Sequence, residues 1–399
     1  MTWKKILVIG AALLLLACGN TKEGEWALCS YGAEKGDSSD DSGGTIFEEA
    51  MGQFDFRDIE AFIRGAKEEN ELGFQEIMEL LIAGELKTLC SRILQAFRKE
   101  LFSEISIGGR LMGQILALGI LGAVFTNFSD VFNGSQISET GFYVTYLLLF
   151  TMLTAGIGQS IQVAADVADV IWQFMKVLMP SYFLVVAFAG GSVSAAAMYE
   201  FTLIIISVGQ WLLGTVLIPA ARVYLLLVFA SNMAKEEMLS RLTELVEKAI
   251  GWGMKSLLGV VLGFHLIQGM VLPYVDSLKN GSVQKLVGMI PGIGQGAAAV
   301  TQMILGSGVL IKNTMGMAAV VVLIILMAVP VIKLAVLMLL YKCVAALMEP
   351  VCDKRLVKCV SAAAKGHKML LQIVITAGLL LVITVAVVCA GTNVTYYGG

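Results

Sequence analysis

Long apolar segments separated by short polar stretches dominate the chain after residue 110. The segments lie at 111–128, 141–163, 177–197, 202–230, 257–273, 286–311, 315–341 and 369–390. A helix needs about 20 consecutive apolar residues to cross a bilayer, and most of these segments are close to that length. The pattern therefore predicts an all-α, polytopic membrane protein with seven or eight transmembrane segments.

Two of these segments leave the count open between seven and eight. The segment 286–311 contains Pro291 and six glycines, which favours a broken or re-entrant element buried in protein. The segment 315–341 is longer than one upright crossing requires and contains Pro330, a residue that kinks a helix interior. We therefore expect irregular backbone on both sides of Lys312.

The first 18 residues have the pattern of an export signal. Two lysines precede an apolar core that ends at Leu16, and small residues follow. This core is too short to span a bilayer comfortably, as in a cleaved signal peptide. The ending also resembles a lipoprotein signal, in which Cys18 would be acylated. Ordinary cleavage after Ala17 and an uncleaved anchor are the alternatives.

Residues 19–105 are predicted to form an exported segment with two parts. Residues 19–45 are acidic and rich in Gly and Ser, so they cannot bury enough apolar area to offset chain entropy and should form a disordered linker. Residues 46–105 carry apolar side chains at helical spacing, which predicts two or three amphipathic helices.

The membrane region is predicted to comprise two repeats, 106–255 and 256–399. A Gly-Ile-Gly-Gln motif followed after sixteen residues by a lysine and then an apolar run occurs in each half. The matching positions are Gly156, Gly158, Gln159 and Lys176 in the first half and Gly292, Gly294, Gln295 and Lys312 in the second. Repeats of this kind enclose the path in many transport proteins. A chance match in a glycine-rich apolar chain is the alternative interpretation.

Composition supports membrane insertion, with 57% hydrophobic and 15% charged residues and a mean hydropathy of +0.80. A soluble domain has about a quarter of its residues charged. The net charge of −3 conceals a local excess of acid, because residues 19–83 contain sixteen acidic against five basic residues. No basic stripe with interleaved aromatic residues is present, so we expect no nucleic-acid partner.

Charged amphipathic helices are predicted before three of the crossings, at 86–101, 235–250 and 354–368. The stretches 231–255 and 342–368 hold four and six basic residues, so the positive-inside rule predicts that both are cytoplasmic. The same rule applied to 86–110 conflicts with the export signal. We expect the signal to decide the location of the N-terminal segment, and the crossings between these stretches stay unassigned.

The residue inventory argues against catalysis or a bound cofactor. Two histidines and seven cysteines occur without a C-x-x-C, H-E-x-x-H or paired His/Cys spacing, so we expect no metal site. The glycine-rich motif at Pro291 lacks the Lys-Ser/Thr ending of a phosphate-binding loop. The chain is expected to be neither an ATPase nor any other enzyme.

Single polar residues inside the apolar segments are the candidate functional residues, either lining a path or joining helices by hydrogen bonds. Three of them, Glu200, Arg222 and Glu349, have a second interpretation as the ends of apolar segments. The candidates are Gln159, Glu200, Arg222, His265, Gln268, Gln295, Lys312, Lys333 and Glu349.

Several short motifs follow one another between Gly306 and Asp353. They are G-S-G-V-L-I-K-N-T-M-G from Gly306, P-V-I-K from Pro330, Leu340-Tyr341, and A-A-x-M-x-P ending at Pro350. Their order and spacing resemble the stage III sporulation protein AE family of endospore-forming bacteria. The export signal, the acidic exported segment and the length of the membrane region are also similar to that family.

The resemblance implies a membrane component of the machine that connects the mother cell to the engulfed forespore and sustains late forespore gene expression. The implied partners are other stage III sporulation membrane proteins, a secretion-type ATPase and a ring-forming protein. The implied location is the mother-cell membrane around the forespore, with the acidic segment between the two membranes.

The residues alone also allow a stand-alone secondary transporter of a small molecule. Its two repeats would enclose a substrate site around Gly156–Gln159, Gly292–Gln295 and His265. Such a transporter would act without other proteins, whereas a subunit of a larger machine would not.

Overall fold

The computed structural model describes residues 56–66, 73–131, 135–189, 192–233, 239–288 and 294–391. The regular structure within these ranges is entirely helical. The elements are α3 (Arg57–Ala66), α4 (Phe74–Ile82), α5 (Leu86–Val131), α6 (Ser135–Phe188), α7 (Ser192–Gln210), the π-helix η1 (Trp211–Leu217), α8 (Ile218–Met233), α9 (Ser240–Gly288), α10 (Gly294–Met348) and α11 (Lys354–Gly391). The predicted export signal with Cys18 and the acidic linker lie outside the described residues.

Six stretches of the described chain are long and apolar enough to cross a membrane. They are Lys87–Phe125, Thr140–Phe188, Ala195–Asn232, Ser240–Gln268, Gly306–Met348 and Lys354–Cys389. The all-α membrane class is confirmed, and the count of seven or eight segments is not.

The difference arises where polar residues divide two apolar segments of the sequence that one continuous helix joins in the structure. The predicted segment 141–163 and the start of 177–197 both lie in α6, which continues through Pro180. In the same way, α10 includes most of 286–311 together with 315–341, and it continues through Pro330. A proline removes one backbone hydrogen bond, and neighbouring helices in a membrane bundle compensate for the loss. Helix α10 is thus regular from Gly294 through Lys312 and Pro330, whereas the predicted break at Pro291 lies outside the described residues.

The charged amphipathic stretches are continuous with the crossings that they precede. Residues 86–101 begin α5, residues 240–250 begin α9 and residues 354–368 begin α11. These helices are correspondingly long: the 55 residues of α10 extend over about 80 Å at ~1.5 Å per residue. A bilayer has a hydrocarbon core of only about 30 Å, so the bundle reaches well beyond it.

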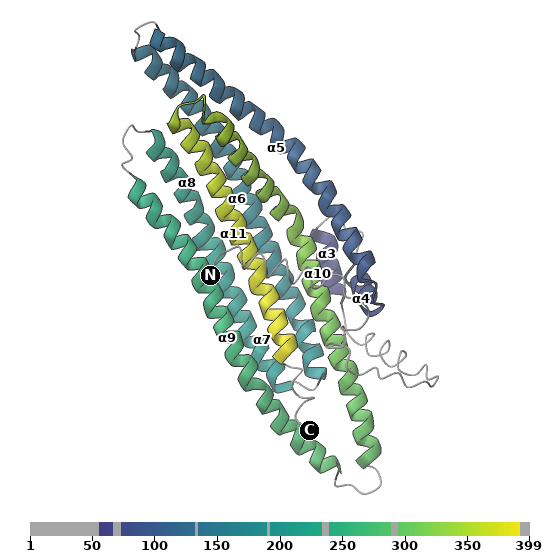
Figure 1. Ribbon diagram of the computed structural model, residues 1–399. Helices are drawn as coiled ribbons and strands as arrows, with labels where there is room; N and C mark the ends of the chain where they lie inside the picture. The colour runs from purple at the N-terminus through teal and green to yellow at the C-terminus, as the bar shows by residue number, and fades with distance from the viewer. Residues whose placement is uncertain are drawn as a thin grey trace.

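Consecutive long helices run in opposite directions and form an elongated bundle (Figure 1). We call the end at which α5, α8 and α10 finish the upper end, and the end at which α6 and α9 finish the lower end. The α5–α6 hairpin extends furthest at the upper end (Figure 1). Helices α6, α10 and α11 pack on one another and form the centre of the bundle.

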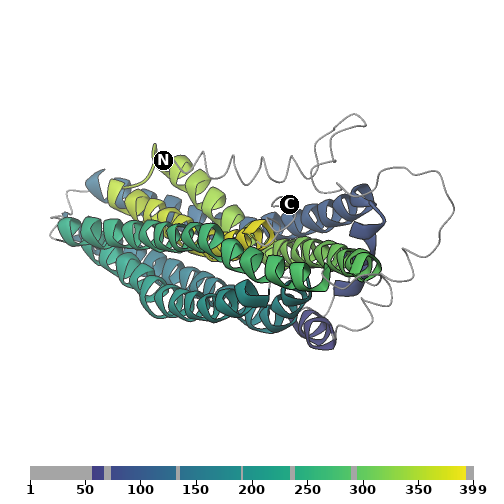
Figure 2. The ribbon, with the colours of Figure 1, turned by 90° about the horizontal axis from the view of Figure 1, so that it is seen from below.

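Two short helices cover the side of this centre. Helix α3 packs on α6, where the rings of Phe62 and Phe174 lie 6.1 Å apart, and α4 packs on α10. Gly84, with φ of +73°, supplies the left-handed conformation at the turn from α4 to α5. Seen from below, α3 lies at the edge of the bundle (Figure 2). These helices occupy part of the predicted amphipathic region 46–105, and their export stays a prediction.

The predicted repeat also stays a prediction. Gly156 and Gly158 lie in the middle of α6, whereas Gly294 is the first residue of α10, and Gly292 lies outside the described residues. Helices α6 and α10 run in opposite directions (Figure 1), so any relation between the two copies would be an inverted one.

A close helix contact joins the lower part of α10 to the end of α6. A Cβ atom on Gly308 would lie 2.9 Å from the Cα atom of Ala189 and 3.1 Å from the ring of Phe188. Because the nearest atoms belong to the backbone, they cannot rotate away as a side chain can. The glycine allows α10 to approach α6 at this point.

Replacing Gly308 with Leu should therefore destabilise the protein by about 1–3 kcal/mol through overpacking. The matched control is Gly158→Leu, because a Cβ atom on Gly158 would meet no other atom within 4 Å. The melting temperature of the detergent-solubilised protein measures both. Equal melting temperatures for the two variants would show that the close approach is unimportant.

Candidate functional site

Three polar contacts join α6 to α11 inside the apolar bundle. The pairs are Tyr146 Oη with Cys359 Sγ at 3.0 Å, Ser160 Oγ with His367 Nε2 at 2.9 Å, and Tyr182 Oη with Cys389 Sγ at 2.8 Å. We call these contacts the α6–α11 seam. They recur along two helices that run in the same direction, so they fix the position of one helix along the other.

The uppermost contact of the seam also holds α8. The Tyr146 hydroxyl donates to the carbonyl of Phe229 at 2.5 Å, so its oxygen accepts from the Cys359 thiol. The nearby start of α11 is capped by Asp353, whose carboxylate accepts a 2.8 Å hydrogen bond from the backbone N–H of Arg355, as in a helix N-cap. The Arg355 guanidinium lies 3.7 Å from the centre of the Phe142 ring, which adds a cation–π contact to α6.

The middle contact pairs a serine with a histidine. His367 Nδ1 lies 2.8 Å from the carbonyl oxygen of Ala363, and a carbonyl only accepts, so Nδ1 carries the proton. In the neutral imidazole Nε2 is then an acceptor. The single proton of the Ser160 hydroxyl is therefore shared between His367 Nε2 at 2.9 Å and the carbonyl oxygen of Gly156 at 3.1 Å.

Tyr341 covers this pair from α10, with its ring centre 4.9 Å from that of His367. Its hydroxyl is buried and has no hydrogen-bond partner among the described residues. A Cβ atom on Gly156 would lie 3.0 Å from this hydroxyl. Gly156, predicted as a repeat motif residue, therefore makes room for Tyr341.

A serine bonded to a histidine is also the arrangement of an activated nucleophile. Here Ser160 is 1% exposed and His367 is 0% exposed, and the aromatic ring of Tyr341 lies against the imidazole. A substrate has no access to the serine oxygen in this arrangement. The pair acts as a hydrogen-bonded link between helices, of the kind that joins membrane helices.

Lys312 lies at the lower end of the seam. Its side chain is fully buried, and Nζ donates to the carbonyl of Cys389 at 3.4 Å. This carbonyl belongs to the last turn of α11, where carbonyls lack intrahelical partners and the helix dipole is negative. The predicted path residue therefore caps a helix terminus with its positive charge.

His265 and Gln268 lie three residues apart on α9 and are both buried. His265 Nε2 lies 3.0 Å from the Thr384 hydroxyl, which already donates to the carbonyl of Leu380, so Nε2 is the donor. Neither His265 Nδ1 nor Gln268 Nε2 has a partner within the described part of the chain. His265 thus links α9 to α11.

Lys333 pairs across to α5 with a carboxylate that the sequence pattern did not single out. Its Nζ lies 3.8 Å from Glu104 Oε1, and Lys333 is 39% exposed while Glu104 is only 9% exposed. A partly exposed ion pair of this kind contributes about 0.5–1 kcal/mol. Its main effect is to neutralise a buried carboxylate.

The remaining predicted residues do not gather into a site. Gln159, Glu200, Arg222, Glu349 and Gly158 are exposed at separate places. Gly294 and Gln295 lie at the start of α10, where side chains are not described, and Gly292 is outside the described residues. The structure thus brings polar residues together as contacts between pairs of helices. Across the described residues, no group of three or more His, Cys, Asp or Glu side chains is placed to hold a metal ion.

These observations define the class of protein: a polytopic helical membrane protein whose buried polar residues join its helices. The family model described as Stage III sporulation protein AE matches residues 72–392, and the chain belongs to this family. It is similar to Stage III sporulation protein AE of Bacillus subtilis (strain 168), at 22% identity over 391 residues, which cover 98% of this chain and 96% of the relative. No solved structure matches. The family that the sequence resembles is therefore confirmed, and it is named for a stage of sporulation rather than for a reaction.

Removing the Ser160 hydroxyl should leave His367 Nε2 buried without a partner. Ser160→Ala should therefore lower the free energy of unfolding by about 1–3 kcal/mol. Ser207→Ala is the matched control, because the exposed Ser207 hydroxyl bonds only the carbonyl of Leu203 in its own helix. Thermal unfolding in detergent measures both variants, and equal stability of the two would contradict the assigned role of the seam.

Proposed function

We propose that this chain is a membrane subunit of the channel or secretion apparatus that links the mother cell and the engulfed forespore. In this role it sustains late forespore gene expression and spore formation. Its partners are other stage III sporulation membrane proteins, a secretion-type ATPase and a ring-forming protein, and it resides in the mother-cell membrane around the forespore. Membership of the sporulation family supports the setting, and an exposed apolar surface supports the role as a subunit.

This surface lies on the α5–α6 hairpin at the upper end. Eight large apolar side chains there are between 37% and 58% exposed, and they follow one face of each helix. They are Ile120, Leu121, Val124 and Phe125 on α5 and Tyr143, Val144, Leu147 and Leu148 on α6. We call them the hairpin stripe.

The hairpin stripe lies at the level of the polar start of α11. A Cβ atom on Gly119 of α5 would touch Met348 and Cys352, and Tyr146 of α6 contacts Cys359. At this level α11 exposes lysines, and its apolar part begins only at Met369. The distance along the chain from Cys352, just before α11, to Cys389 near its end is about 55 Å at ~1.5 Å per residue.

The hydrocarbon core of a bilayer is only about 30 Å thick. Lipid tails in one flat bilayer therefore cannot cover both the hairpin stripe and the apolar part of α11 that begins at Met369. If the lower halves of α9, α10 and α11 lie in the bilayer, the hairpin stripe lies beyond it. An exposed apolar surface of this size outside lipid is typical of a contact with another protein. This observation carries the proposal of a subunit in an assembly.

The directions of the helices also bear on the two conflicting expectations about orientation. The start of α5, which follows α3 and α4 in the chain, and the end of α11 lie at the same, lower end of the bundle (Figure 1). The basic starts of α9 and α11 then lie together at the opposite, upper end. An exported N-terminal segment and a cytoplasmic upper end are thus compatible, in line with the positive-inside rule.

The alternative function, a stand-alone transporter, has no comparable structural observation in its favour. Its expected site would unite Gly156 with His265, but Gly156 packs near His367 and His265 contacts Thr384. Between His367 and Thr384 the distance along α11 is about 25 Å at ~1.5 Å per residue. The described residues of that expected site are therefore far apart.

Affinity purification of the tagged chain from sporulating cells in mild detergent, followed by mass spectrometry, tests the proposal. We expect a secretion-type ATPase, small polytopic proteins and a ring-forming protein in stoichiometric amounts. Recovery of the chain alone, with and without crosslinking, would exclude the subunit role.

A photoreactive amino acid at Val124 or Leu148 should form crosslinks to another protein in sporulating cells, because both positions lie in the hairpin stripe. The control position is Lys354, which is exposed at the same end but outside the stripe. Gel shifts of the tagged chain measure the adducts. Adducts to lipid alone at Val124 and Leu148 would show that the stripe faces the bilayer.

Orientation can be measured with reporter fusions. A reporter that is active only outside the cytoplasm should be active when fused in the α9–α10 connection at residue 290 and inactive when fused in the α8–α9 connection at residue 235. A reporter that works only in the cytoplasm should give the opposite result. The reverse pattern would overturn the assignment of the upper end to the cytoplasm.

A further inference from the structure

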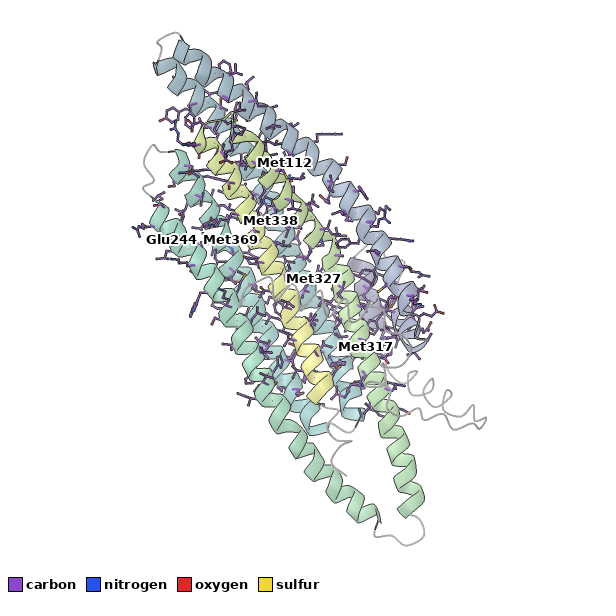
Figure 3. The ribbon with its side chains drawn as sticks, viewed as in Figure 1. Met112, Glu244, Met317, Met327, Met338 and Met369 are labelled. Atoms are coloured by element: carbon purple, nitrogen blue, oxygen red, sulfur yellow. The ribbon has the colours of Figure 1, made fainter. Side chains whose placement is uncertain are left out.

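An open groove of about 610 Å³ lies at the upper end between α8, α9, α10 and α11. Its volume falls in the range of about 300–1,000 Å³ that is typical of small-molecule sites. The charged residues that line it are four lysines, Lys342, Lys358, Lys365 and Lys368, and two glutamates, Glu244 and Glu247. Figure 3 labels Glu244 in the first turns of α9 and Met369 in α11.

The sequence of α11 directs its lysines to this groove. Lys358, Ser361, Lys365 and Lys368 are spaced by three or four residues, so they share one face of the helix, and all four line the groove. The residues between them, including Cys359, Ala363 and His367, are buried against the other helices. One helix thus presents the seam on one side and a basic face on the other.

The groove keeps an excess of positive charge after its carboxylates are paired. Glu247 Oε2 lies 2.5 Å from Lys365 Nζ, and Glu244 Oε1 lies 2.7 Å from Nζ of Lys248, which is not part of the lining. Among the described residues, no carboxylate pairs with Lys342 or Lys368. An anion placed between these two lysines would meet net positive charge.

The groove lies at the boundary between polar and apolar surface. Lys368 directly precedes the apolar part of α11, and Lys342 directly follows the apolar part of α10. Trp252 on α9, one turn before Lys255, is 74% exposed, as is typical of tryptophan at a membrane interface. Val223 on α8 and Leu339 on α10 are exposed beside the groove on its lower side.

We propose that this groove binds the headgroup of an anionic phospholipid. The phosphate lies between Lys342 and Lys368, and the acyl chains extend toward the lower end along the exposed apolar faces of α8 and α10. Basic pockets between transmembrane helices bind anionic lipid headgroups in this way. The location at the polar–apolar boundary favours a lipid over an acidic protein segment, because a lipid uses the lysines and the adjacent apolar surface together.

The test uses the purified full-length chain in neutral detergent. Phosphatidylglycerol and phosphatidylcholine are titrated separately, and binding is measured by native mass spectrometry and by the shift in melting temperature. We expect retention and stabilisation with phosphatidylglycerol only. In the double variant Lys342→Gln/Lys368→Gln, the affinity should fall at least tenfold.

The matched control is Lys255→Gln/Lys354→Gln, which removes the same charge from exposed positions that do not line the groove. It should retain the affinity of the original chain. If the glutamine variant of the groove does not fold, Lys342→Arg/Lys368→Arg replaces it, and this variant should retain binding because both charges remain.

Four outcomes would overturn the proposal. They are equal binding of the two lipids, equal loss in the groove and control variants, complete competition by inorganic phosphate at the lipid concentration, and tighter binding of a soluble polyglutamate peptide than of phosphatidylglycerol. The third would indicate a site for a free phosphate group, and the fourth would indicate a site for an acidic protein segment.

Discussion

A polar group buried among apolar helices costs free energy unless a partner takes its hydrogen bond, and this constraint fixes the α6–α11 seam. Once Tyr146, Ser160 and Tyr182 of α6 meet their partners on α11, neither helix can slide without breaking contacts at three levels. Helix α10 then has defined neighbours for Tyr341 and Lys312. The outer helices join this centre by similar single links, such as His265 to Thr384.

The polar contacts described above lie inside the bundle, whereas the hairpin stripe is an apolar surface on its outside. Lys312 and His265, which first suggest a transport path, make contacts between helices. The hairpin stripe and the basic groove are two surfaces that are open to other molecules. The chemistry available to other molecules is therefore on the outside of the bundle. This arrangement is in line with the proposed role as a subunit of an assembly.

The apolar segments could be predicted from the sequence, because hydropathy is a local property. Helix continuity and side-chain contacts could not, because they depend on residues that are distant in the chain. Pro330 suggested a kink, and the polar residues between 163 and 177 divided two predicted segments, but α10 and α6 are both continuous helices. His367 lies in the predicted charged helix 354–368, and the sequence pattern did not single it out, although its side chain is fully buried. Ser160 is 207 residues away from its partner, and no local pattern relates the two. Glu104 was missed because it follows a charged stretch, and only the fold places it beside Lys333.

The hairpin stripe also affects how long an unassembled copy of the protein persists in the cell. If another chain covers the hairpin stripe as proposed, a newly inserted copy carries uncovered apolar surface at the upper end until that chain binds. Cellular proteases and chaperones act on such surfaces and remove unassembled chains. The amount of this protein in the cell would then follow the supply of whatever covers the stripe, so that the composition of the membrane assembly is set by degradation of surplus subunits as well as by synthesis.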